Sequence, residues 1–402
     1  MLERVAPEAQ GFSAERLGRI RDVMGRYVDE GKLAGVATLI ARRGQIAHLD
    51  TVGWADLAAR RPLGEDAIYR IYSMSKPITI VAALMLWEEG RFLLDDPVSR
   101  YIPELGEMQV LRGIEDGKPV LSPPASPMTI RHLMTHTAGM TYGMFAPDSP
   151  GEQMYRESGL LRSDHTLADM IQILKGLPLL FDPGSRWLYS VSIDVLGYLV
   201  EVLSGMPLDA YFRERIFQPL GMADTGFCVP ADAVHRLASF YMPGEQGRLT
   251  PVDERAGRDY TRAEPFCSGG GGLVSSILDY ARFAQMLANG GELEGVRLLS
   301  PRTVALMGSN HLPPALGAYG DPPHAGHGFG LGVRVLLDPA AAGQLDAPGS
   351  FGWSGYASTD YWVDPANEML GIIMMQFVAP PPMMGYPTAA QFRTLAYQAL
   401  VE

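Results

Sequence analysis

The chain can be interpreted outward from residues 69–79, which read YRIYSMSKPIT. An uncharged apolar run at 78–86 follows, and it predicts a buried helix whose first turn carries Ser73 and Lys76. Because residues three apart share a helix face, the hydroxyl and the amine are expected to lie side by side. Pro77 suits a first turn, where its missing N–H costs little. The free N–H groups of a helix N-terminus would then surround Ser73, a setting that helps a weak nucleophile attack a carbonyl.

Lys76 is expected to serve in chemistry rather than as a solvated surface charge. The chain has only four lysines among its 33 basic residues, and this one opens a helix predicted to be buried, where an unpaired charge is costly. The spacing Ser-x-x-Lys occurs in serine acyl enzymes. Such enzymes need further groups, which must come from other parts of the chain.

Composition sets the broad class of the protein. The 402 residues are 47% apolar, enough for a substantial core in two domains or in one domain with an insertion. A net charge of −12 disfavours nucleic acid and anionic membranes as partners. Cys228 and Cys267 lack metal or redox spacing and are interpreted as reduced packing residues. Residues 1–17 contain no apolar core of signal-peptide length, which predicts a cytoplasmic location.

One stretch near the C-terminus could be mistaken for a membrane span. Residues 369–392 carry no charge and are numerous enough to cross a bilayer. Prolines at 380–382 and 387 interrupt the stretch. A strand followed by a proline-rich loop is therefore predicted, and no membrane association.

Hydrophobic periodicity and turn residues place strands near both ends of the chain and helices in the middle. Ser13 and Thr129 are expected to cap helices. Strands are predicted at 35–41, 45–52, 330–337, 356–363 and 369–377. Besides the helix after Ser73, helices are predicted at 17–28, 129–137, 164–177, 192–203, 208–217, 276–289, 301–307 and 389–401. Residues 104–127 are predicted to form a polar loop.

This order predicts an α/β (α+β) fold. Strands from both ends are expected to join one antiparallel sheet, covered by the two terminal helices. The predicted domains are an α/β domain of residues 1–72 and 265–402 and a mainly helical inserted domain of residues 73–264. The active site is expected at their junction.

Two further motifs accompany the Ser73 segment. Tyr189-Ser190-Val191 precedes a predicted buried helix, and Trp353-Ser354-Gly355 precedes a predicted strand. With Ser73-x-x-Lys76 they resemble the three-motif pattern of the penicillin-recognising serine hydrolases, closest to the class C β-lactamase-like carboxylesterases, the family VIII esterases. Further matches in the same order, covering most of the chain, are TIRHLMTHT at 129–137, PLGM at 219–222 and GGGLVS at 270–275.

The resemblance implies a role for each matching residue. Ser73 would be the nucleophile that forms an acyl-enzyme, and Lys76 would lie next to Tyr189 and favour its phenolate. Tyr189 would take the Ser73 proton, pass it to the leaving alcohol and then activate water. The oxyanion would lie between the backbone N–H groups of Ser73 and of Tyr356, the second of these on an edge strand. Each such donor contributes roughly 10²–10³ in rate.

Two departures from the pattern indicate the subfamily. β-Lactamases and transpeptidases usually begin the third motif with a lysine that binds a substrate carboxylate, and here Trp353 replaces it. Their second motif usually ends in an asparagine that binds the substrate amide, and here Val191 replaces it. Uncharged esters are therefore the expected substrates. The predicted substrate-binding residues are Trp353, Ser354, Gly355, Val191 and Trp187.

Rival hypotheses were weighed on the same residues. A Ser-His-Asp hydrolase of the strand–elbow–helix kind lacks its Gly-x-Ser-x-Gly mark. His132 and His136 share a helix face, but the glutamate of a zinc-protease motif is missing, so structural histidines are expected. Residues 268–272 (SGGGG) lack the Gly-Lys-Ser/Thr of a phosphate loop and are interpreted as a tight turn near the site.

The predicted function is a serine carboxylesterase with a small-molecule ester as its substrate and no metal or cofactor. A β-lactamase or D-Ala peptidase and an acyltransferase with the same acyl-enzyme remain open as alternatives. A non-catalytic protein of this fold is disfavoured because Ser73, Lys76 and Tyr189 are all present.

Overall fold

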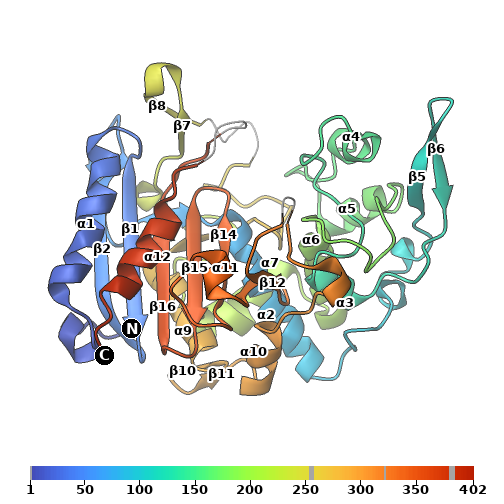
Figure 1. Cartoon of the computed structure of the whole chain (residues 1–402). Coiled ribbons are helices and arrows are strands. Elements are labelled where there is room, and N and C mark those ends of the chain that lie inside the picture. The colour runs from blue at the N-terminus through green and yellow to red at the C-terminus, as the bar shows by residue number, and fades with distance from the viewer. Residues whose placement is uncertain (1, 253–257, 321–322, 380–384) are drawn as a thin grey trace.

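An eight-stranded antiparallel sheet forms the centre of the computed structural model, which describes residues 2–252, 258–320, 323–379 and 385–402 (Figure 1). The strand order is β12-β13-β14-β15-β16-β1-β2-β3. These strands are β1 (Gly35–Arg42), β2 (Gln45–Asp56), β3 (Arg61–Pro62), β12 (His327–Phe329), β13 (Arg334–Leu336), β14 (Phe351–Gly355), β15 (Thr359–Asp364) and β16 (Met369–Met374). The two ends of the chain meet where β1 pairs with β16, with Leu39 opposite Ile372. The predicted sheet of sequence-distant strands is confirmed.

Helices cover both faces of this sheet. The terminal helices α1 (Ala14–Asp29) and α12 (Thr388–Gln398) pack together on one face, as predicted, and α9 (Ile277–Ala288) packs on the other (Figure 1). Ser13 caps α1, because its side chain accepts a hydrogen bond from the Arg16 N–H at 3.3 Å. The apolar stripe of α1 thereby faces β1, while its polar side stays in solvent.

The helix that follows the Ser73 segment is α2 (Ser75–Glu88). Every residue from 75 to 86 is buried, so α2 is a core helix rather than an amphipathic surface helix. It packs on α6 (Ser192–Ser204), which also contacts α3 (Ile130–Met134), α5 (Leu167–Leu174) and α7 (Leu208–Phe212). The α2–α6 pair therefore fixes the Ser73 segment to the first turn of α6, which follows Tyr189.

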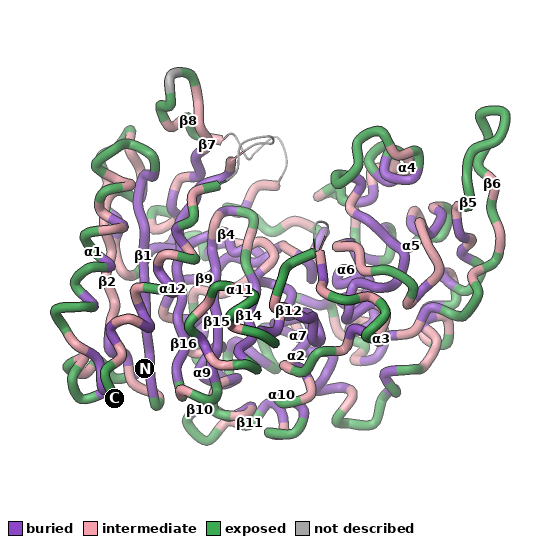
Figure 2. The backbone as a smooth tube through the Cα atoms, in the orientation of Figure 1, coloured by how far each residue is buried: buried purple, intermediate pink, exposed green. Residues whose placement is uncertain are grey.

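Residues 104–127 were expected to form a loop, and this prediction is wrong. They contain the hairpin β5 (Val110–Glu115) and β6 (Lys118–Ser122), which projects from the helical region and is largely exposed (Figure 2). Asp116 and Gly117 form the turn with positive φ angles of 49° and 74°. Asp-Gly is the preferred pair for such a turn, but the flanking residues are too polar for the alternation that marks a half-buried strand.

Other boundaries differ by smaller amounts. The predicted strand at 356–363 starts at Thr359, and a separate strand, β14, precedes it. The prediction also missed α4 (Pro150–Glu157). The boundaries drawn between the two predicted domains stay a prediction.

The uncharged stretch at 369–392 begins with β16, as predicted, and Pro387 precedes α12. The prolines at 380–382 lie outside the described residues. Within the described part of the chain, the structure contains no helix with the length and apolarity that a bilayer crossing needs.

His48 should make the stability of the sheet depend on pH. It lies on β2 and shares a 2.8 Å hydrogen bond with the Thr38 hydroxyl on β1. Burial lowers the pKa of His48 from 6.5 to about 4, so the unfolded chain binds the extra proton between these values. The free energy of unfolding should therefore fall by about 2–3 kcal/mol through this residue as the pH decreases from 6.5 to 4.

Urea unfolding at pH 4, 5, 6 and 7 measures this effect. His48→Gln should show a shallower loss of stability toward acid than the native protein, while His235→Gln, at an exposed position, serves as the control. Parallel curves for the native protein and His48→Gln would contradict the prediction.

Candidate active site

Ser73 lies in the 3₁₀ turn η2 (Tyr72–Met74), directly before α2. The expected position in the first turn of the α-helix is therefore corrected by two residues. Tyr72, just before the serine, has a φ of +42°, a backbone conformation that non-glycine residues rarely adopt. Such strain is typical of functional sites. Lys76 Nζ donates a hydrogen bond to Ser73 Oγ at 3.2 Å, so the structure joins the two groups that the spacing paired.

Within the described residues, the Lys76 ammonium forms hydrogen bonds but no salt bridge. The side chain is only 1% exposed, and Nζ donates to the Gly270 carbonyl at 2.6 Å as well as to Ser73. The ammonium also lies 4.4 Å from the ring centroid of Tyr189 and 5.3 Å from that of Tyr142. Cation–π attraction to two ring faces stabilises a charge in this dry environment. The glycine run at 268–272 is thus a tight turn beside the site, as predicted.

Tyr189 lies beside Lys76, but its hydroxyl is directed to another partner. Trp353 Nε1 donates a hydrogen bond to the Tyr189 oxygen at 3.2 Å. Within the described part of the chain, this oxygen makes no hydrogen bond to Ser73 or Lys76, and the amine instead faces the ring. Trp187 stacks on the Tyr189 ring at 6.2 Å and 19°. The Lys76 amine therefore contacts both the serine hydroxyl and the ring of Tyr189.

Sequence reasoning missed a buried carboxylate behind Lys76. Asp194 is completely buried in the first turn of α6 and accepts hydrogen bonds from the Ser268 hydroxyl and from the Gly270 N–H, the latter at 3.0 Å. Burial raises the pKa of Asp194, while the charge of Lys76 opposes that change. Because Gly270 presents its carbonyl to Lys76, Asp194 fixes the turn that holds the amine. An acidic residue in the first turn of a largely apolar helix, five positions after Tyr189, was the signal available in the sequence.

Asp194→Asn should therefore weaken catalysis without removing it. An amide in place of the carboxylate loses charge-assisted hydrogen bonds, each worth about 1.5–3 kcal/mol, so we expect kcat to fall about 10- to 100-fold with a small change in KM. Steady-state kinetics on 4-nitrophenyl butyrate measures this. Ser268→Ala, which removes one donor to the same carboxylate, should have a smaller effect, and the reverse order would contradict the proposed positioning.

The backbone of Tyr356 lies close to the Ser73 segment, although not where it was expected. Tyr356 lies in the turn between β14 and β15 rather than on a strand, and the adjoining residues 353–355 pair, among the described strands, with β15 alone. A Cβ atom on Gly355 would lie 2.3 Å from the Ile71 carbonyl oxygen, so only glycine allows this approach of strand to turn. The rings of Tyr72 and Tyr356 lie 5.6 Å apart. That the backbone N–H groups of Ser73 and Tyr356 together bind the oxyanion stays a prediction.

The residues predicted to bind substrate differ in accessibility. Trp353 is 8% exposed, whereas Ser354, one residue later, is exposed and Trp187 is half-buried. Val191 is completely buried in the core, which leaves its side chain no surface to offer a substrate. An aromatic wall continues from Trp187 and Trp353 through Tyr319 and Phe329, with ring centroids 5.3–5.9 Å apart.

The histidines of the rival metal hypothesis have structural partners. Nδ1 of His132 accepts a hydrogen bond from the Thr129 N–H and completes the capping box of α3. His136 is buried with Nδ1 3.3 Å from the Ser190 hydroxyl, and burial lowers its pKa well below the ordinary value. Among the described residues no three candidate ligands gather into a metal site. Cys228 and Cys267 are free and half-buried.

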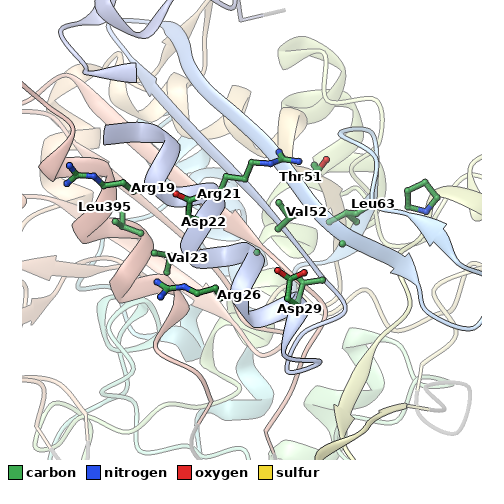
Figure 3. A pocket seen from close by; sticks show the side chains of 14 residues that line it. Arg19, Arg21, Asp22, Val23, Arg26, Asp29, Thr51, Val52, Leu63 and Leu395 are labelled. Atoms are coloured by element: carbon green, nitrogen blue, oxygen red, sulfur yellow. The ribbon is translucent and has the colours of Figure 1, made fainter. Parts of the chain in front are cut away.

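A separate hollow of about 1040 Å³ lies between α1 and β2 (Figure 3). Arg19, Arg21 and Arg26 line it together with Asp22 and Asp29. It opens beside the helix layer that covers the face of the sheet opposite to α9, and it contains no serine or tyrosine. Ser73, Lys76 and Tyr189 lie instead at the border of the sheet and the helical region.

A sheet covered by terminal helices, with a Ser-x-x-Lys pair where the helical region meets it, defines the class of penicillin-recognising serine hydrolases. Comparisons with known proteins agree. Residues 20–396 match the β-lactamase family model. Esterase EstB of Burkholderia gladioli is 32% identical over 406 residues, which cover 96% of each chain. The protein belongs to the β-lactamase family.

Two further relatives span nearly the whole chain. Protein Rv1367c of Mycobacterium tuberculosis is 35% identical over 378 residues, which cover 91% of this chain and 93% of that protein. Among solved structures, EstCE1, a hydrolase with promiscuous acyltransferase activity, has a TM-score of 0.81 at 29% identity and covers 95% of this chain and 99% of its own. The fold is therefore shared over nearly the whole chain with a hydrolase of known structure.

Proposed function

We propose that this protein is a serine carboxylesterase that hydrolyses short-chain or modest-sized esters through an acyl-enzyme on Ser73. The observation that carries the proposal is the 3.2 Å hydrogen bond between Lys76 Nζ and Ser73 Oγ, with Tyr189 beside the same amine. The esterase relatives support ester cleavage as the reaction class.

In the proposed acylation step, Ser73 Oγ forms a bond to the ester carbonyl carbon. Tyr189 takes the serine proton and passes it to the leaving alkoxide as the carbon–oxygen bond to the alcohol breaks. In deacylation Tyr189 takes a proton from water, the water oxygen bonds to the acyl carbon, and Ser73 leaves with the proton. The products are a carboxylic acid and an alcohol, and no cofactor takes part.

Two contacts hold Tyr189 in place for these proton transfers in this proposal. The Lys76 ammonium lies over its ring, and the Trp353 N–H already donates to its oxygen. Trp353 therefore has a second role besides lining the pocket, since its indole N–H orients the base.

The substrate class follows from what surrounds Ser73. Trp353 occupies the position where β-lactamases carry a cation, and an indole cannot pair with the carboxylate of a β-lactam. Paired assays with 4-nitrophenyl butyrate and a chromogenic cephalosporin test this. We expect kcat/KM for the ester to exceed that for the cephalosporin, and the opposite order would replace the esterase proposal with a β-lactamase.

Acyl transfer is the second candidate, because the same acyl-enzyme can react with an alcohol instead of water. The promiscuous acyltransferase activity of EstCE1 favours testing it. Products formed from vinyl butyrate in the presence of 1-butanol would separate butyl butyrate, the transfer product, from butyric acid, the hydrolysis product.

A further inference from the structure

Two adjacent apolar side chains are exposed in a turn close to the proposed base. Met144 is 61% exposed and Phe145 is 46% exposed, in the segment between α3 and α4. The Phe145 ring lies 6.2 Å from the Tyr189 ring and 6.5 Å from the Tyr142 ring. The pair, named here the rim pair, therefore extends the aromatic surroundings of Tyr189 into solvent.

The segment that carries the rim pair is fixed by a buried carboxylate. Glu152 on α4 is 2% exposed. Its Oε1 accepts from the Thr141 hydroxyl at 2.6 Å, and its Oε2 accepts from the Phe145 N–H at 3.2 Å. One oxygen of this carboxylate thus holds the start of the turn at Thr141, and the other holds its end at Phe145. Met144 lies next to that end.

Backbone packing restrains the same turn. Gly143 has a φ of +80°, and a Cβ atom there would lie 2.6 Å from the backbone nitrogen of Arg156. The Gly143 carbonyl also accepts a hydrogen bond from Arg156 at 3.3 Å. The turn is packed directly on α4, so the outward orientation of the rim pair is built into the fold.

Such an arrangement is unfavourable unless the exposed side chains have a use. Burying a carboxylate costs free energy that its hydrogen bonds only offset, and holding two large apolar side chains in water gains no hydrophobic stabilisation. Single exposed apolar residues are ordinary, but two adjacent ones on a turn fixed by a buried carboxyl group, with the Phe145 ring beside the proposed base, indicate a binding surface.

We propose that Met144 and Phe145 bind the alcohol portion of the substrate ester, and that the preferred alcohols are bulky and apolar. This inference rests on the proposed function, in which Tyr189 protonates the leaving alkoxide. The alcohol oxygen must then lie within reach of the Tyr189 hydroxyl, and the alcohol carbons extend from that oxygen toward the neighbouring rim pair. Glu152 is a positioning residue that acts through the segment it holds.

Acetates of methanol, 1-butanol and 3-phenylpropan-1-ol test the proposal, because they vary the size of the alcohol while the acyl group stays constant. In the native protein kcat/KM should rise along the series. Phe145→Ala should lower kcat/KM for 3-phenylpropyl acetate about 10-fold and change that for methyl acetate less than twofold, as expected for loss of one apolar contact. Glu152→Gln should reduce the same preference, since its amide nitrogen cannot accept a hydrogen bond.

A matched control is Leu93→Ala, at a side chain that is 65% exposed beyond the far end of α2. It should leave the alcohol series unchanged. A second series, 4-nitrophenyl esters from acetate to hexanoate, varies the acyl group, and Phe145→Ala should not alter the ratios among its members.

Two results would overturn the inference while the proposed function stands. One is an equal loss for methyl and 3-phenylpropyl acetate in Phe145→Ala, and the other is a change confined to the acyl series. Full activity of Ser73→Ala on every ester would instead remove the proposed function, so the two failures are distinguishable.

Discussion

Ser73→Ala should lower kcat/KM for 4-nitrophenyl butyrate by at least about 10³-fold, because nothing else in the proposed mechanism can form the acyl-enzyme. The loss should appear in kcat, since the hydroxyl reacts only after substrate binds. The variant should fold normally, because Ser73 is half-buried. Within the described residues, its hydroxyl makes one hydrogen bond, which it accepts from Lys76.

The nucleophile can also be identified directly. Mass spectrometry after treatment with a fluorophosphonate should find one adduct, on the peptide that contains Ser73. Ser75→Ala is the matched control, because Ser75 is completely buried and its hydroxyl accepts from the Leu273 N–H at 3.1 Å. That variant should lose about 1 kcal/mol of stability and keep the adduct. An adduct on another residue would contradict the mechanism.

Tyr189→Phe should lower kcat by about 10²–10⁴-fold, the usual contribution of a general acid–base group. Phenylalanine keeps the ring on which Trp187 stacks and over which the Lys76 ammonium lies, so only the hydroxyl is lost. KM should change little, because the proton transfers occur in the transition state. Stopped-flow measurement of 4-nitrophenol release separates acylation from deacylation, and both should slow.

Tyr356→Phe is the control for this experiment. Tyr356 lies in the same part of the structure, its side chain is 60% exposed, and only its backbone N–H is assigned a role. This variant should keep kcat within about twofold of the native value. If Tyr189→Phe also stayed within fivefold, the Lys76 amine, 3.2 Å from Ser73 Oγ, would have to act as the base by itself.

Local sequence patterns predicted the structure correctly where it depends on residues that are close together in the chain. Ser13 and Thr129 cap helices as predicted, and the strands predicted at 35–41 and 45–52 form the hairpin of β1 and β2. These features follow from short-range hydrogen bonding and turn geometry, and both depend on which residue types stand at a few consecutive positions. The Ser-x-x-Lys spacing belongs to the same group, because one turn of chain brings both side chains to one place.

Predictions were less accurate where pairing between distant segments decides the outcome. The N–H group of Tyr356 was expected on an edge strand, yet Tyr356 lies in the turn between β14 and β15. The sequence of a short strand does not show where the strand ends and its turn begins. The hairpin at 110–122 was missed for a related reason, since its strands are exposed and lack the alternation that burial imposes.

The sequence by itself determined the family pattern, the antiparallel sheet with its terminal helices, and the pairing of Ser73 with Lys76, because motif order and helical spacing are properties of the chain. Only the tertiary structure decided that Asp194 holds the turn beside Lys76, that the Tyr189 oxygen accepts from Trp353, and that Glu152 fixes the rim pair. Each of these contacts joins side chains whose distance depends on how helices and strands pack, and packing is a property of the whole core rather than of any segment.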